Sequence, residues 1–150
     1  MESYDSLSTF PDVAPTLKKL STNPDIECVV FSNGTQSMVS NSVNHSRELS
    51  PYASVFRSLV TVDFVGSFKP APEVYRYLAE RTEKVGKENE MWLVSGNPFD
   101  VVGARAVGMQ VAWVDRAGNG WQDMLGGEPT VVVRSLEEVA DAVAKRAGKE

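Results

Sequence analysis

The stretch Ile26-Glu27-Cys28-Val29-Val30-Phe31-Ser32-Asn33-Gly34 carries the pattern that decides the fold of this chain. Its first six residues are mostly apolar and rich in the side-chain types that favour a strand. The run then stops in Ser-Asn-Gly, which signals a turn and the start of a helix. We therefore expect a strand over residues 26–31 and a helix over residues 35–48.

The same order of strand, polar turn and helix recurs along the rest of the chain. The last helix is expected to begin at Ser135, because Ser135-Leu136-Glu137-Glu138 has the spacing of a capping box. Strands that alternate with helices indicate an α/β protein built on a parallel, doubly wound sheet. The pattern predicts further strands over residues 59–62, 91–94, 111–114 and 130–133, helices over residues 13–20, 73–84, 100–107 and 135–147, and a glycine-rich loop over residues 117–127.

The composition is that of one globular domain and argues against several classes of function. The chain has 150 residues, of which 42% are apolar, enough to build a core. Its formal charge of -5 argues against a nucleic-acid partner, and no apolar run reaches the roughly 18–20 residues that span a bilayer. The single cysteine, Cys28, has no partner for a disulfide within the chain, which indicates a reducing compartment. We expect a cytoplasmic protein that acts on a small molecule.

Polar side chains stand at the carboxyl ends of the predicted strands, where ligands bind in sheets of this type. A simpler interpretation remains open for each of them, such as a turn and helix cap at Ser32-Asn33-Gly34 or a solvated loop lysine before Pro70. The candidates are Ser32, Asn33, Asp63, Lys69, Ser95 and Asn97.

Three clusters at these strand ends resemble, in order, the second, third and fourth motifs of the haloacid dehalogenase superfamily. The resemblance implies a Rossmann-like, three-layer α/β core, of which residues 1–150 form the C-terminal part and residues 1–10 a remnant of the exit from the cap domain. The clusters are Ser32-Asn33-Gly34, Lys69-Pro70-Ala71-Pro72-Glu73-Val74-Tyr75 and Ser95-Gly96-Asn97-Pro98-Phe99-Asp100, with Gly103-Ala104-Arg105 and Ala112-Trp113-Val114-Asp115-Arg116 beyond them.

The fourth motif indicates the branch of the superfamily. Phosphoryl-transferring members carry acidic residues there that hold magnesium, a cation that prefers carboxylate oxygens. Here the first two polar positions are the neutral Ser95 and Asn97, and only Asp100 offers a carboxylate. The pattern is similar to that of the 2-haloacid dehalogenases, so no metal and no cofactor are expected.

In those enzymes an aspartate displaces halide from carbon and the resulting ester is hydrolysed. The resemblance implies that Lys69 supplies a fixed positive charge beside this nucleophile. It also implies that Asp100, oriented with Ser95 and Asn97, positions or activates the hydrolytic water. Asp100 has a simpler reading as an acid favoured at a helix N-terminus.

The resemblance assigns a second set of residues to the substrate. Ser32 and Asn33 would bind the carboxylate or the halide side of a 2-haloacid, and Tyr75 would hydrogen-bond in the same network. Tyr75 could equally be a half-buried helix tyrosine.

The family's first motif, an aspartate in a pattern like Asp-x-x-Gly-Thr at the end of a strand, has no counterpart in this sequence. Asp63-Phe64-Val65-Gly66-Ser67 matches it superficially, but stands where relatives have a loop leading to the motif lysine. We therefore expect the nucleophile, the central first strand and the cap to be missing and this chain alone to be inactive.

A gap between the strands that end at Ser32 and Ser95 would expose two sheet edges, which indicates a homodimer that covers them. Two other functions stay open. The chain could be a binding or assembly module that has lost its chemistry, or a divergent phosphatase that uses another acid.

Overall fold

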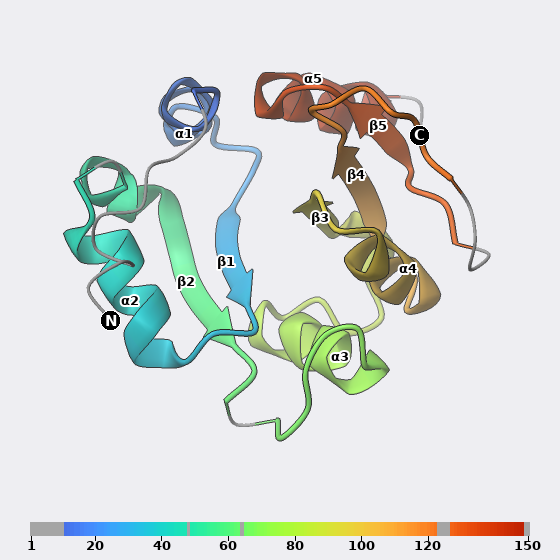
Figure 1. The fold of residues 1–150 in the computed structure, drawn as a ribbon, viewed down its shortest axis with the longest axis horizontal. Helices are drawn as coiled ribbons and strands as arrows, with labels where there is room; N and C mark the ends of the chain where they lie inside the picture. The colour runs from blue at the N-terminus through green and yellow to red at the C-terminus, as the bar shows by residue number, and fades with distance from the viewer. Residues whose placement is uncertain (1–10, 48, 64, 123–126, 149–150) are drawn as a thin grey trace. The chain divides into compact units, whose positions relative to one another are not determined.

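The computed structural model describes residues 11–47, 49–63, 65–122 and 127–148. The expected cap remnant at residues 1–10 lies outside these residues, as do residues 123–126 of the predicted glycine-rich loop. The chain divides into two compact units, residues 1–66 and 67–150, and each contains its own parallel sheet (Figure 1).

The first unit is built on a two-stranded parallel sheet. β1 (Cys28–Ser32) pairs with β2 (Phe56–Thr61), with Val30 opposite Leu59. Helix α2 packs against β2 and begins at a true cap, because the Thr35 hydroxyl accepts a hydrogen bond from the Met38 amide. The other elements of this unit are α1 (Val13–Ser21), α2 (Gln36–His45) and the 3-10 helix η2 (Ser50–Val55).

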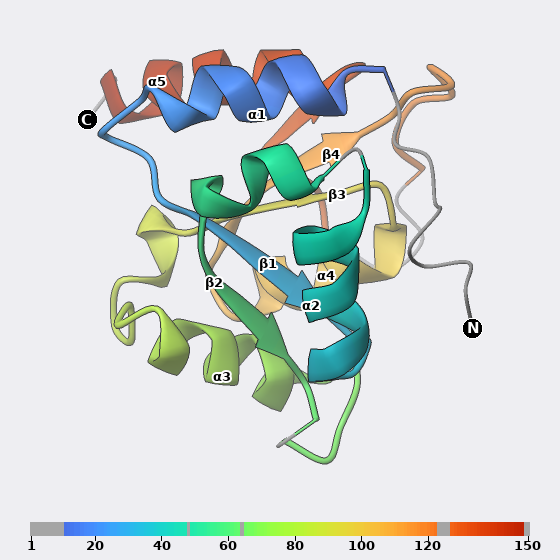
Figure 2. The same cartoon turned by 90° about the vertical axis from the view of Figure 1, so that its left-hand side faces the viewer.

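The second unit holds a three-stranded parallel sheet in the order β3-β4-β5. All five residues of β4 are buried, so this strand forms the centre of the unit. Figures 1 and 2 show α4 and α5 on opposite faces of the sheet. The elements are α3 (Pro72–Arg81), η3 (Glu88–Glu90), β3 (Trp92–Ser95), α4 (Pro98–Ala106), β4 (Gln110–Val114), β5 (Val131–Val133), η4 (Leu136–Glu138) and α5 (Val139–Gly148).

The predicted α/β class with parallel strands is confirmed, and every predicted strand is present within a few residues. The predicted capping box at Ser135 is also present, with the Glu138 carboxylate accepting from the Ser135 amide. The predicted helix over residues 35–48 is too long, because Ser46 adopts an extended backbone and ends α2 at His45. None of the described helices combines the length and the apolar character needed to cross a bilayer.

Candidate functional site

A buried cluster of three polar side chains lies in the second unit. The Lys69 ammonium donates to one carboxylate oxygen of Asp100 over an Nζ–Oδ2 distance of 3.1 Å. The Tyr75 hydroxyl donates to the other oxygen over an Oη–Oδ1 distance of 2.5 Å. The side chains of Lys69 and Asp100 are 12% and 3% exposed, and Tyr75 is fully buried. The fold therefore brings two residues that lie 25 and 31 positions before Asp100 in the sequence into contact with its carboxylate.

Two prolines determine where the helices that carry this cluster begin. Pro72 starts α3 and Pro98 starts α4, at positions where a helix needs no amide donor. As a result Tyr75 lies in the first turn of α3 and Asp100 in the first turn of α4, where the helix dipole favours a negative charge. Lys69 precedes α3 in the loop, and its peptide bond to Pro70 is cis.

The surroundings of Tyr75 keep its hydroxyl protonated. Burial, followed by the hydrogen bond to Asp100 and the negative charge of that carboxylate, raises the pKa of Tyr75 well above its ordinary value. At neutral pH the phenol is therefore a fixed hydrogen-bond donor to Asp100.

Ser95 is the last residue of β3, and Asn97 is the N-cap residue of α4. The Ser95 hydroxyl accepts a hydrogen bond from the Asn97 amide at 3.1 Å, and the Asn97 side chain is exposed. Both residues flank the segment that leads into Asp100. The structure thus places all four residues expected to be catalytic, Lys69, Ser95, Asn97 and Asp100, in the second unit.

The residues expected to bind substrate are divided between the units. Tyr75 lies in the second unit, whereas Ser32 ends β1 in the first unit and Asn33 follows it. The Ser32 hydroxyl accepts a hydrogen bond from the Gly34 amide at 2.9 Å, which is the turn that the simpler reading anticipated. Their roles with substrate stay predictions.

Asp63 has a structural contact that the sequence did not reveal. Its carboxylate accepts a hydrogen bond from the Gln36 amide at 2.8 Å, in the first turn of α2. An acid in this position satisfies an amide that a helix cannot bond internally. Asp63 therefore anchors α2 to the end of β2.

Contacts of Trp113 and Asp115 support the loop between Ser95 and α4, and the sequence analysis did not predict them. The Trp113 indole N–H donates to the Gly96 carbonyl at 3.2 Å, and Trp121 packs edge-on against Trp113 with ring centroids 5.0 Å apart. Asp115 holds the following loop by accepting hydrogen bonds from the amides of Gly118, Asn119 and Gly120. The glycines that follow Asp115 were the available signal, since an aspartate before such a segment favours this turn.

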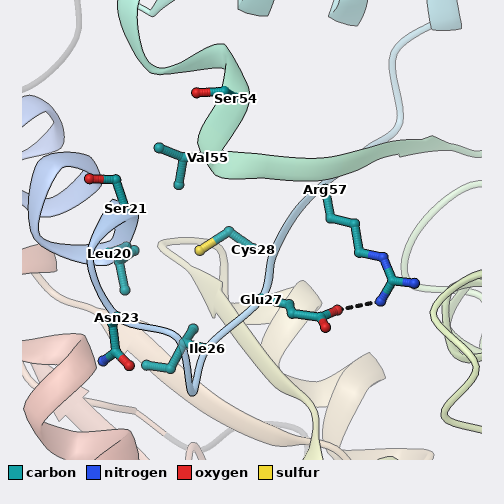
Figure 3. A pocket seen from close by; sticks show the side chains of 9 residues that line it. All are labelled: Leu20, Ser21, Asn23, Ile26, Glu27, Cys28, Ser54, Val55 and Arg57. Carbon is teal, nitrogen blue, oxygen red and sulfur yellow. Dashed lines mark hydrogen bonds and ion pairs between the residues drawn. The ribbon is translucent and has the colours of Figure 1, made fainter.

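A hollow of about 350 Å³ lies in the first unit, at the amino ends of β1 and β2 (Figure 3). Its charged groups, Glu27 and Arg57, form an ion pair with each other and are largely exposed. Burial raises the pKa of the Cys28 thiol, which keeps this side chain protonated and weakly nucleophilic. Ligands of parallel sheets bind at the carboxyl ends of the strands, so we place the candidate site at the Asp100 cluster and not in this hollow.

Metal ligands are not grouped in the part of the chain that the structure describes: no three His, Cys, Asp or Glu side chains there lie close enough together to hold an ion. Asp100 instead has an ammonium group and a phenol as its neighbours.

Comparison with known proteins gives consistent matches. The family described as haloacid dehalogenase-like hydrolase matches residues 1–114. The chain is 34% identical over 140 residues to (S)-2-haloacid dehalogenase H-109 of Pseudomonas putida, an alignment that covers 93% of this chain and 59% of that protein. It is 32% identical over 143 residues to haloacetate dehalogenase H-2 of Moraxella sp. (strain B), covering 95% of this chain and 60% of the relative.

Solved structures agree with these matches. The L-2-haloacid dehalogenase from Xanthobacter autotrophicus with chloropropionic acid covalently bound superposes with a TM-score of 0.79 at 25% identity, covering 95% of this chain and 64% of that one. A dehalogenase solved as an intermediate complex gives a TM-score of 0.79 at 28% identity, covering 94% and 59%. The chain spans about 60% of the length of these two curated relatives.

Proposed function

This chain belongs to the haloacid dehalogenase-like hydrolase family, and we therefore propose that it supplies Lys69, Asp100 and their hydrogen-bonding partners to a 2-haloacid dehalogenase site. The observation that carries the proposal is the buried contact of Lys69 and Tyr75 with the Asp100 carboxylate. Burying a charged pair costs free energy unless the pair is well hydrogen-bonded, so such clusters are candidates for function.

In the proposed reaction an aspartate attacks the carbon that bears the halogen, and the carbon–halogen bond breaks as halide leaves. Water then attacks the carbonyl carbon of the ester, which releases a 2-hydroxyacid and restores the carboxylate. Lys69 has the fixed positive charge that stabilises an anionic nucleophile, and it lies where the loop before α3 holds it against Asp100.

Asp100 is proposed to orient the water and accept its proton. Each oxygen of an ionised carboxylate has two lone-pair sites, so Asp100 retains acceptor capacity after binding Lys69 and Tyr75. Ser95 and Asn97 hold the loop before α4, and Ser32 and Asn33 are proposed to bind the substrate carboxylate or halide. This set is proposed to work without metal or cofactor.

Complementation tests this function, since no Asp-x-x-Gly-Thr nucleophile pattern occurs in the 150 residues. The chain is co-expressed with the part of the P. putida relative that precedes the aligned region, and halide release from a 2-haloacid is measured. We expect release that falls by about 100-fold or more in Lys69→Met and in Asp100→Asn. Lys84→Met is the control, because Lys84 pairs with Glu90 away from the cluster.

Two outcomes would contradict the proposal. One is that the mixed pair releases no halide, although the two parts of the relative, separated at the same position and co-expressed, do release it. The other is halide release by this chain alone that Asp63→Asn abolishes, since that would make Asp63 the nucleophile.

Metal independence separates this proposal from a phosphatase. We expect millimolar magnesium to leave the thermal melt of the chain unchanged. A ligand that binds only the folded state at 100 times its dissociation constant would add about 2.7 kcal/mol of stability. An upward shift of the melt that is lost in Asp100→Asn would favour the phosphatase instead.

The proposal extends to the setting of the protein. A small 2-haloacid is the proposed partner, in keeping with the net charge of -5, which disfavours nucleic acid. Because the only cysteine is unpaired, a cytoplasmic location is proposed, which cell fractionation would test.

A further inference from the structure

Gly103 lies in α4, three residues after Asp100, and therefore on the same face of the helix. Glycine inside a helix is less stable than alanine, so its presence there calls for a reason in the packing. That reason is the ring of Tyr75 on α3. A Cβ atom added at Gly103 would lie 2.6 Å from Cε2, 2.9 Å from Cζ and 2.8 Å from the hydroxyl oxygen of Tyr75. All three distances are shorter than real Cβ contacts.

The Tyr75 ring lies in the core of the second unit. Tyr75 is fully buried, and so are Val74 on α3 and Val101 and Ala104 on α4. Because protein interiors are packed at crystal-like density, an added atom at Gly103 would force the whole Tyr75 ring to move. One of the Tyr75 atoms that this Cβ would meet is the hydroxyl oxygen, which donates the hydrogen bond to Asp100.

We propose that Gly103 is a positioning residue for the Asp100 carboxylate, acting through Tyr75. Without a side chain at 103, the Tyr75 ring lies directly against the α4 backbone and its hydroxyl reaches the first turn of the helix. With a methyl group there, the ring is displaced and the hydrogen bond to Asp100 is lost. This inference rests on the proposed function only for the role of Asp100, because the contacts themselves are measurable without activity.

NMR of the chain with ¹³C-labelled tyrosine and aspartate tests the proposal. In Gly103→Ala we expect the Cζ resonance of Tyr75 to shift, and the Cγ resonance of Asp100 to shift in the direction seen in Tyr75→Phe. In the variant that combines Gly103→Ala with Tyr75→Phe, the shift of the Asp100 resonance should equal that of Tyr75→Phe alone, because both changes remove the same hydrogen bond. Ala106→Gly is the matched control: it exchanges the same two residue types on an exposed site of α4 and should move neither resonance.

The proposal is overturned if Gly103→Ala leaves both resonances in place, or if it moves the Asp100 resonance equally in the Tyr75→Phe background. If Gly103→Ala does not fold, it is examined in the Tyr75→Leu background, where the contacting ring atoms are gone. A folded double variant supports the proposal. Failure to fold in both backgrounds overturns it, because Gly103 would then serve the packing of α4 by itself.

Discussion

Asp100 is the residue on which the candidate site depends, because both of its carboxylate oxygens are engaged and its side chain is 3% exposed. A carboxylate removed from water in this way needs its partners, and their loss leaves an uncompensated buried charge. The contributions of Lys69 and Tyr75 to stability are therefore measurable without substrate.

Replacing Lys69 by methionine should destabilise the chain strongly. The variant keeps the apolar stem but removes the cation from Asp100, which costs about 3–5 kcal/mol for a buried pair. Urea unfolding at pH 7 measures the loss. Lys69→Met combined with Asp100→Asn should recover most of it, and Lys84→Met, in an exposed pair, should show no resolvable change. A Lys69→Met variant as stable as the wild type would mean that the buried pair contributes nothing.

Tyr75 should make the protein sensitive to alkaline pH. Its pKa is raised in the folded chain, whereas an unfolded tyrosine ionises at about pH 10. Above about pH 10 the folded state therefore keeps the phenol proton that the unfolded state loses. The contribution of Tyr75 to the free energy of unfolding is fully present below about pH 10 and decreases above it, by up to about 1.4 kcal/mol per pH unit. Urea unfolding between about pH 9 and pH 11 should show a steeper loss in the wild type than in Tyr75→Phe. Equal slopes would contradict the burial of the phenol.

The residues of the Asp100 cluster were named from sequence, but their contact was not predictable from it. Lys69 before a proline has the local signature of a solvated loop residue, and only the packing of the loop and α3 against α4 buries it. Tyr75 had two equally good readings, and the structure satisfies both at once: it is a core residue whose hydroxyl donates to Asp100. Nothing local in the sequence indicates the hydrogen bond from the Trp113 indole to the Gly96 carbonyl.

At the scale of the elements, sequence patterns located strands better than helix ends. The strand that the structure shows over residues 28–32 was predicted over residues 26–31, since a β-rich run that ends in a turn is a local property of the sequence. The end of α2 was misplaced because Ser46 leaves the helix through an extended backbone that composition does not signal.

The loop after β4 supports the loop before α4 through a series of side-chain contacts. Asp115 is 6% exposed and binds three successive amides, and the loop that it orders carries Trp121 onto Trp113, whose indole holds the Gly96 carbonyl. A carboxylate that accepts several amide hydrogen bonds is a strong fixed point. The two loops that border β3 and β4 are therefore coupled through two tryptophans.

Asp115→Asn should weaken the contacts that order the loop after β4. The amide oxygen replaces only one of the two carboxylate oxygens and carries no charge, so we expect a loss of about 1–3 kcal/mol. The near-UV circular dichroism of the Trp113–Trp121 pair should weaken with it. Asp25→Asn, on an exposed residue, is the matched control and should leave both signals unchanged. An unchanged tryptophan signal in Asp115→Asn would mean that the loop holds its shape without the carboxylate.

At the scale of the whole molecule, the alternation of strands and helices was sufficient to predict a parallel α/β protein, because right-handed crossover through a helix is the normal way to connect parallel strands. The division into two units, each with a sheet of its own, was not predictable from alternation. Strand order depends on contacts distant in sequence, which the local pattern does not encode.

Edge strands make a specific prediction about assembly. Among the described residues β1 pairs only with β2, and β3 pairs only with β4, so each sheet has an apolar strand at its edge. Such edges present unpaired backbone groups that favour association with another chain, and identical chains most often do so as a twofold dimer. We therefore expect light scattering after size exclusion to give twice the chain mass of 16.4 kDa at micromolar concentration. Val94→Lys, which places a charge on the edge strand β3, should shift the protein to monomer, whereas Val85→Lys, at a more exposed valine outside the sheets, should leave the dimer intact. A wild-type chain that is a monodisperse monomer with a cooperative melt would show that each sheet tolerates its open edge.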